Sequence, residues 1–211
     1  ERRPFDDELA REAPDFPTLS EPEVVRHYTR LSQWNFSIDS GMYPLGSCTM
    51  KYNPKINDKL AGLKGFSGAH PLLPDELSQG ALEIMYALEG FLREISGMDA
   101  VSLQPAAGAQ GELAGMLVIH AYHRKNGSRR SKIIIPDTAH GTNPASAALC
   151  GYEPIAVQSN EQGILSPETV AAVMDNDTAG IMVTNPNTLG LFEENIREIT
   201  RIVHEKDGLV Y

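Results

Sequence analysis

Lys132-Ile133-Ile134-Ile135 is the stretch that decides the fold, because three β-branched residues follow one another between a lysine and a proline. A strand that is apolar at every position is typical of a parallel sheet covered on both faces, whereas a half-exposed strand alternates. Further runs that are predicted to be strands occur at 100–103, 154–157, 181–184 and 209–211.

Helical patterns separate these runs. Apolar residues recur at helical spacing between 75 and 96, and Gly97 stands where a helix often ends. Helices are also predicted at 108–125, at 143–150, from Ser166 onward and at 194–206. This alternation of strand and helix predicts an α/β domain with a mostly parallel sheet and flanking helices.

Residues 1–74 differ from this pattern and are predicted to form an N-terminal arm before the α/β domain of residues 75–211. Prolines punctuate an acidic lead-in, and Ser20 with Glu23 forms a capping box that predicts a helix ending near Gln33. A short helix capped by Asn53 is expected at 54–60, with irregular structure on either side of it.

The composition narrows the possible functions. The 211 residues are 41% hydrophobic and 22% charged, and 18 Lys and Arg against 28 Asp and Glu give a net charge of −10. An acidic chain is not expected to bind nucleic acid, and no apolar run approaches the roughly 20 residues that cross a bilayer. With two cysteines and a polar beginning, we expect a cytoplasmic protein without a disulfide framework or signal peptide.

Sites in parallel sheets lie at the carboxyl ends of the strands, so the loops at those ends are the candidates. The first such loop reads Gln104-Pro105-Ala106-Ala107 and runs into the helix that starts at Gly108. Small residues let a ligand approach the backbone, and the unpaired N–H groups of a helix start suit a phosphate. Close packing of the helix on the sheet explains the same small residues, so both explanations stand at this point.

A histidine follows the strand at 132–135. His140 is flanked by an alanine and a glycine, so its ring is a candidate for stacking on a planar ligand or for acid–base chemistry. An ordinary loop histidine is the alternative. No other histidine is spaced to bind a metal with it, and no metal site is predicted. His120 and His123 lie three apart beside Arg124 and are expected at a solvated helix edge.

Two more segments draw attention. The loop after 181–184 carries Thr184, Asn185 and Asn187, although turn formation alone explains an Asn-Pro-Asn sequence. The segment 43–51 has no period and contains Cys48, whose only evident activator is a nearby lysine, so a nucleophilic thiol is not expected. Cys150 is expected in the core.

Four motifs occur in a fixed order along the chain. They are Tyr43-Pro44-Leu45-Gly46-Ser47-Cys48-Thr49-Met50-Lys51, Ala107-Gly108-Ala109-Gln110-Gly111-Glu112, Asp137-Thr138-Ala139-His140-Gly141-Thr142-Asn143-Pro144-Ala145-Ser146 and Val183-Thr184-Asn185-Pro186-Asn187-Thr188-Leu189-Gly190. Together they resemble glycine decarboxylase, the P-protein of the glycine cleavage system. The arm before Tyr43 resembles the start of the second subunit in the two-subunit form.

The resemblance implies the aspartate-aminotransferase-like fold of pyridoxal-phosphate (PLP) enzymes, here as a truncated large-domain core. In that family PLP is the cofactor, glycine is decarboxylated and the aminomethyl group passes to the lipoyl arm of the H-protein. The resemblance also implies a companion P-protein subunit as a partner.

Matching positions imply roles for particular residues. The cofactor phosphate would be held by Ala107, Gly108, Ala109 and Gln110. His140 would stack on the pyridine ring. The cofactor edge near its phenolic oxygen would be faced by Thr184, Asn185 and Asn187. The entrance for glycine and the lipoyl arm would be lined by Ser47, Cys48 and Thr49, with Ser47 and Thr49 facing the substrate and no covalent role for Cys48.

The sequence departs from the family at Tyr211. In that fold an aspartate that pairs with the pyridinium nitrogen and a lysine that forms the internal Schiff base both come later. Lys51, Lys132 and Lys206 lie in other contexts. We therefore expect an N-terminal portion of the enzyme that is inactive alone. The alternatives are another PLP enzyme of this fold, an aminotransferase or lyase, or a non-catalytic subunit acting in assembly.

Overall fold

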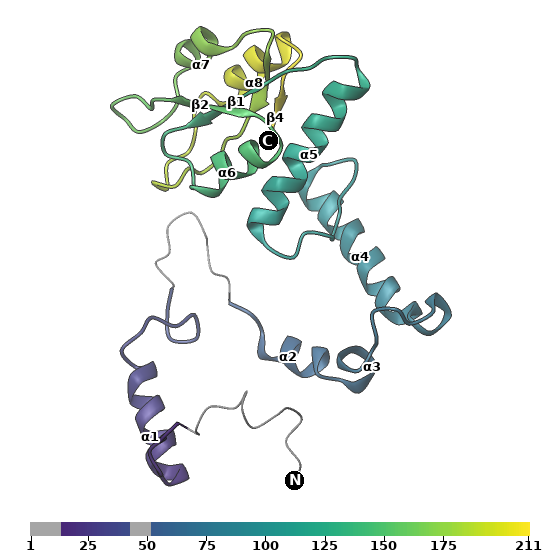
Figure 1. Cartoon of the computed structure of the whole chain (residues 1–211), viewed down its shortest axis with the longest axis vertical. Coiled ribbons are helices and arrows are strands. Elements are labelled where there is room, and N and C mark those ends of the chain that lie inside the picture. The colour runs from purple at the N-terminus through teal and green to yellow at the C-terminus, as the bar shows by residue number, and fades with distance from the viewer. Residues whose placement is uncertain (1–13, 43–51) are drawn as a thin grey trace, which may run out of the picture. The chain divides into compact units, whose positions relative to one another are not determined.

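The computed structural model describes residues 14–42 and 52–211 (Figure 1). The described residues fall into two units, one of residues 14–42 with Tyr52 and one of residues 53–211. The predicted boundary between an arm and an α/β domain at residues 74 and 75 stays a prediction.

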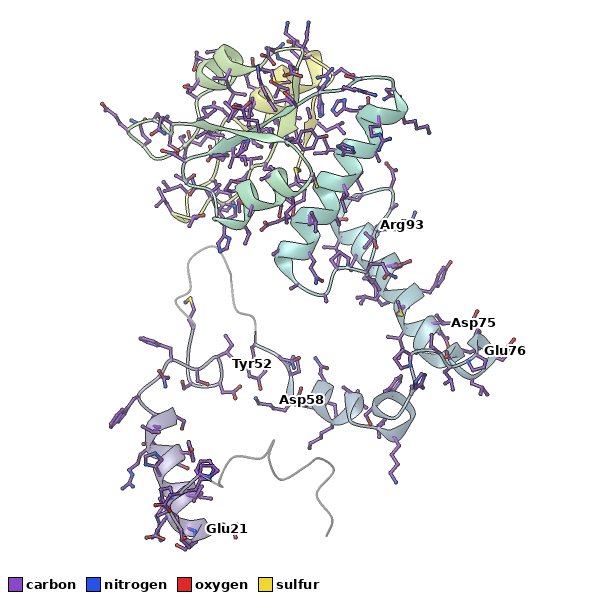
Figure 2. The ribbon with its side chains drawn as sticks, in the orientation of Figure 1. Glu21, Tyr52, Asp58, Asp75, Glu76 and Arg93 are labelled. Atoms are coloured by element: carbon purple, nitrogen blue, oxygen red, sulfur yellow. The ribbon has the colours of Figure 1, made fainter. Side chains whose placement is uncertain are left out.

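The first unit contains helix α1, Glu21–Ser32, and confirms the helix predicted there. The Glu23 carboxylate accepts the Ser20 N–H at 2.8 Å and the Ser20 hydroxyl at 2.6 Å, and these bonds hold the pKa of Glu23 below its ordinary value. Glu21 lies in the same first turn (Figure 2), where negative charge offsets the helix dipole. None of the residues of α1 is buried.

The second unit begins with α2 (Lys55–Ala61), α3 (Lys64–Ser67), the short 3-10 turn η2 (Asp75–Leu77) and α4 (Gln79–Ser96). The helix predicted at 54–60 is confirmed one residue later, but its N-cap is Pro54, and the Asn53 side chain instead accepts a hydrogen bond from Asn57 at 2.8 Å.

Helix α4 is ended by Gly97, as predicted, in the left-handed conformation with φ 67°. Figure 2 shows Asp75 and Glu76 in the turn that precedes the helix and Arg93 towards its other end. Charges placed in this way suit the helix dipole.

Four parallel strands form one sheet in the order β2-β1-β3-β4, and this confirms the predicted α/β class with its parallel sheet. Their bounds are β1 Lys132–Pro136, β2 Glu153–Val157, β3 Thr178–Ile181 and β4 Leu209–Val210. The strand predicted at 100–103 is wrong, because this stretch pairs with none of the described strands.

The third strand starts at Thr178, earlier than predicted. Gly180 interrupts the apolar run by which a strand is recognised in the sequence, yet the strand needs this glycine. A Cβ there would lie 2.1 Å from the carbonyl oxygen of Leu209 in the neighbouring strand β4. Because the two backbones lie so close together, only a residue without a side chain fits at this position.

Helices α5 (Gly108–Lys125), α6 (Thr142–Leu149), α7 (Pro167–Val173) and α8 (Ile196–Glu205) accompany the sheet (Figure 1). The bounds predicted for α5 are confirmed at both ends. Ile133 and Ile135 of β1 pack in a cluster with Met116, whereas Ile134 packs in a second cluster with Ile199. Both faces of β1 are thus covered, and each buried isoleucine contributes roughly 1.5–3 kcal/mol.

Two contacts fix the direction of α5. A Cβ on Gly115 would lie 2.4 Å from the Tyr211 ring, so the first half of α5 passes close to the end of β4. In its last turn, His123 Nε2 lies 2.8 Å from the carbonyl oxygen of Ala179 in β3. Helix α5 therefore runs antiparallel to the strands and starts at their carboxyl ends. The expected solvated edge is wrong for His123, which is buried beneath this helix.

Candidate functional site

Three predicted loops meet at one edge of the sheet, its carboxyl edge. Strand β1 is followed by the loop of His140 and its neighbour β3 by the loop of Thr184, and parallel neighbours end at the same edge. The start of α5 lies at this edge too, because the helix runs antiparallel to the strands. The topology therefore brings the described candidates to a common edge.

The start of α5 has the features of an anion site. Ala107 is extended, with φ −153° and ψ 167°, and the first helical bonds run from the N–H groups of Gln110 and Gly111 to its carbonyl, each at 3.1 Å. The N–H groups of Gly108 and Ala109 precede these bonds and point out of the helix start. A Cβ on Gly108 would meet nothing within 4 Å, so a ligand can approach the backbone.

Gln110 has a second task in this loop. Its side-chain oxygen Oε1 accepts the N–H of Ala106 at 2.7 Å. This bond ties the loop before α5 to the first helical turn and shapes the backbone around the exposed N–H groups.

His140 is exposed, and its orientation is fixed from one side. Its Nδ1 lies 3.2 Å from the backbone nitrogen of Thr142 and 2.8 Å from the Thr142 hydroxyl. Because the Thr142 N–H can only donate, Nδ1 accepts, and a neutral ring carries its proton on Nε2. The ring of this exposed residue is thus held through Nδ1 by the following turn.

The loop of His140 is tied to the loop after β2 through Asp137. Its carboxylate accepts the N–H of Ser159 at 3.1 Å and the Ser159 hydroxyl at 2.6 Å. This residue was not singled out from the sequence, although a carboxylate directly after a buried strand is a signal that points to this edge.

Thr184 and Asn185 are exposed after β3, whereas Asn187 is buried. The Asn187 amide donates to the Gly163 carbonyl at 2.9 Å and to the Glu193 carboxylate at 3.2 Å. Its oxygen accepts two backbone N–H groups of the same loop, at 3.0 and 3.2 Å. All of its hydrogen-bonding positions are used within the chain, so Thr184 and Asn185 are better placed to meet a ligand.

Glu193 is a buried residue of the loop after β3 whose bonds the sequence did not predict. It is buried, and its carboxylate accepts the Leu165 N–H at 2.8 Å as well as the Asn187 amide. Its own N–H donates to the Asn185 side chain at 3.1 Å. This buried carboxylate therefore ties Asn187 in the loop after β3 to the backbone at Leu165. A glutamate after two apolar residues gives no signal of such a role.

Ser47, Cys48 and Thr49 lie outside the described residues. Within residues 14–42 and 52–211, no three His, Cys, Asp or Glu side chains gather as metal ligands do. No helix in these ranges is both long and apolar enough to span a membrane.

The lysines of the sheet region lie away from the carboxyl edge. Lys125 ends α5, Lys132 begins β1 and Lys206 precedes β4, so all three stand towards the amino ends of the strands. The Lys132 ammonium lies 2.7 Å from the Asp175 carboxylate, and this bond lowers the pKa of Asp175 to about 2. None of these three lysines lies at the carboxyl edge.

Comparison with known proteins supplies relatives for the whole chain. No protein-family model matches. The chain is 56% identical, over 217 aligned residues, to the probable glycine dehydrogenase (decarboxylating) subunit 2 of Caldanaerobacter subterraneus subsp. tengcongensis. That alignment covers 100% of this chain and 45% of the relative, so the chain spans less than half the length of the curated relatives that it matches.

Solved structures show the same fold. A glycine decarboxylase (P-protein) of the glycine cleavage system, in inhibitor-bound form, superposes with a TM-score of 0.71 at 20% identity, over 97% of this chain and 45% of the other. An alanine aminotransferase from Pyrococcus furiosus superposes with a TM-score of 0.52 at 18% identity, over 89% of this chain and 47% of the other.

The parallel sheet, its helices and these neighbours establish the fold of the PLP-dependent aminotransferase-like proteins. The sequence relatives are more specific than the fold. Over its full length, this chain is homologous to part of glycine dehydrogenase (decarboxylating) subunit 2.

Proposed function

We propose that the protein containing this chain is a PLP-dependent glycine decarboxylase subunit, which works with a companion subunit and passes an aminomethyl group to lipoylated H-protein. The observation that carries the proposal is 56% identity, along the whole chain, to a glycine dehydrogenase (decarboxylating) subunit 2. The donors at the start of α5 support it, because they fit the phosphate of the cofactor.

The cofactor phosphate is proposed to bind at the start of α5. The N–H groups of Gly108 and Ala109 would donate to it, and Gln110 would hold the loop through its bond to Ala106. The helix dipole adds favourable charge at the same place. The open space at Gly108 is the feature that makes this fit possible.

Residues after β1 and β3 are proposed to orient the cofactor ring. His140 would stack on its face with the orientation that Thr142 gives it. Thr184 and Asn185 would meet the cofactor edge, while Asn187 acts through the loop that it shapes with Glu193. When bound, PLP supplies the electron sink for the loss of carbon dioxide from glycine.

Ser47 and Thr49 are proposed to face the substrate and Cys48 to line the entrance without a covalent role. The amine that binds the PLP aldehyde is proposed to come from outside the sheet region described here. Lys125, Lys132 and Lys206 are not suited to that role, because none of them lies at the carboxyl edge.

The experiment is a titration of the full-length subunit with PLP, followed by absorbance, in the Gly108→Glu variant. A carboxylate at the helix start repels the phosphate, so PLP binding is expected to weaken about tenfold or more. Ala121→Glu adds the same charge to an exposed position farther along α5 and should bind PLP normally. Equal affinity in the two variants would refute the proposed phosphate site.

Release of labelled carbon dioxide from carboxyl-labelled glycine, with the companion subunit and lipoylated H-protein present, tests the reaction. Turnover supports the proposal. PLP binding without glycine turnover would point to the non-catalytic alternative, and turnover of a different amino acid to an aminotransferase or lyase.

A further inference from the structure

A cavity of about 320 Å³ opens at the amino edge of the sheet, opposite the carboxyl edge. It is lined by the last turns of α5, by residues 128–130 of the following loop and by Tyr152. Helix α5 has 18 residues and is roughly 27 Å long, so the cavity lies about that far from the candidate cofactor site. A cavity of this size admits a small molecule.

The floor of the cavity is formed by Arg130, whose side chain is held by several bonds. The Arg130 side chain is 8% exposed, and its guanidinium donates to the carbonyls of Thr178 at 2.8 Å and Lys206 at 2.7 Å. It also lies 3.3 Å from the carboxylate of Asp207. Arg130 thus links its own loop to the start of β3 and to the turn before β4. The Asp207 carboxylate forms its ion pair with Arg130.

Two further guanidinium groups line the cavity without a carboxylate. Arg124 and Arg129 are exposed, and no acidic side chain within residues 14–42 and 52–211 forms an ion pair with either of them. Both guanidinium groups are therefore available to an anion. Guanidinium groups bind phosphate oxygens in pairs of parallel hydrogen bonds.

His123 in the cavity wall carries an unsatisfied nitrogen. The residue is 2% exposed, and Nε2 donates to the Ala179 carbonyl, because a carbonyl can only accept. Nδ1 is buried and has no hydrogen-bond partner among the described residues. A buried polar atom without a partner is costly and calls for an explanation. With Nε2 donating, Nδ1 is an acceptor, and the P–OH group of a hydrogen phosphate in the cavity would satisfy it.

The carbonyls at the end of α5 do not oppose an anion strongly. The carbonyls of Tyr122, His123 and Arg124 each accept a backbone N–H from residues 126–128, at 3.1, 2.9 and 3.1 Å. These hydrogen bonds reduce the negative partial charge at the end of the helix. The basic side chains of the last turn offset the charge that remains.

We propose that this cavity is a second anion site, which binds the phosphate group of a small molecule or inorganic phosphate. Arg124 and Arg129 donate to the phosphate oxygens, Arg130 holds the surrounding backbone in place, and His123 Nδ1 accepts a hydrogen bond from the P–OH group. The proposal rests on the amino edge alone and is independent of the chemistry at the carboxyl edge.

The test is a calorimetric titration of the PLP-loaded full-length subunit with inorganic phosphate. Loading with PLP fills the candidate phosphate site at the start of α5, so that further binding reports the cavity. One phosphate per chain is expected, with a dissociation constant of about 1 mM or tighter. The double variant Arg124→Ala with Arg129→Ala should bind at least about tenfold more weakly.

Lys125→Ala is the matched control, because Lys125 carries the same charge in the same turn but does not line the cavity. It should bind phosphate as the parent protein does. A double change of both arginines to lysine keeps the charge and should lose part of the affinity, since lysine lacks the planar fork.

Titration with glycerol phosphate and with acetate distinguishes the sources of the anion. Tighter binding of glycerol phosphate than of inorganic phosphate supports a phosphorylated small molecule, and equal binding supports the free ion. Acetate that binds as tightly as phosphate, no phosphate binding at all, or equal phosphate affinity in the double arginine-to-alanine variant would overturn the proposal.

Discussion

Helices α4 and α5 each contain 18 residues, yet only α5 buries side chains. Ile95 of α4 is 83% exposed, whereas Met116 of α5 is fully buried. The apolar stripe of α4 is the more regular of the two. A stripe therefore predicts that a helix forms, but burial depends on the element that packs against it, which for α5 is the sheet.

The largest expected effect comes from two methionines, one in each helix. Met116→Ala removes a fully buried side chain and should lower the free energy of unfolding by about 2–5 kcal/mol. Met85→Ala in α4 changes a residue that is 41% exposed and should cost less than about 1 kcal/mol. Urea unfolding of the 211-residue chain measures both, and equal losses would contradict the difference between the helices.

Alanine substitutions at two glycines, one in each helix, are expected to change the stability by smaller amounts and in opposite directions. Gly115→Ala pushes a methyl group into the Tyr211 ring and should destabilise by about 1–3 kcal/mol. Gly90→Ala in α4 meets no atom within 4 Å and should stabilise by up to about 1 kcal/mol through helix propensity. Thermal unfolding followed by circular dichroism shows the signs. A stabilising Gly115→Ala would mean that the Tyr211 ring moves aside easily.

The smallest expected effect concerns two carboxylates with lowered pKa values. The bond from Lys132 lowers the pKa of Asp175 from its ordinary value of 3.8 to about 2, and it joins two distant parts of the chain. The Asp175 carboxylate therefore stabilises the fold above pH 3.8, and this contribution is lost as the pH falls towards 2. Asp175→Asn should flatten the pH dependence of the urea midpoint in that window.

Glu23 in α1 is the control, because its pKa is lowered by Ser20 in the same helix start. Glu23→Gln should change the helical signal of α1 and leave the urea midpoint of the sheet unchanged. If Glu23→Gln also flattened the pH dependence, the contrast between local and long-range contacts would be wrong.

The sequence predicted those elements whose signals are local. The bounds of α5 follow from its glycine-rich start and the Asn126-Gly127 end, and the capping box of Ser20 and Glu23 forms as expected. The start of β3 was missed because position 180 must be a glycine to leave room for the backbone of Leu209, which lies in another strand. The strand at 100–103 failed for the same reason, since pairing depends on a partner that no local pattern reveals.

The location of the candidate site was predictable from topology, because parallel strands bring their loops to one edge. Its internal bonding was not. The Glu193 carboxylate accepts the N–H of Leu165, and the Asp137 carboxylate accepts the Ser159 hydroxyl. Both hydrogen bonds join segments that are separate in the sequence. The exposed and buried members of the Thr184, Asn185 and Asn187 set are likewise distinguished only by these contacts.

The pairing of β1 with β3 at the centre of the sheet has a consequence for the order of folding. The pairs β1–β2 and β3–β4 each join nearer positions in the sequence than the pair β1–β3 does. Closing a shorter loop costs less entropy, so the two outer pairs are expected to form before the centre joins them. Destabilising substitutions where β1 pairs with β3 should then mainly speed unfolding, because these contacts form late. Destabilising substitutions within either outer pair should slow folding.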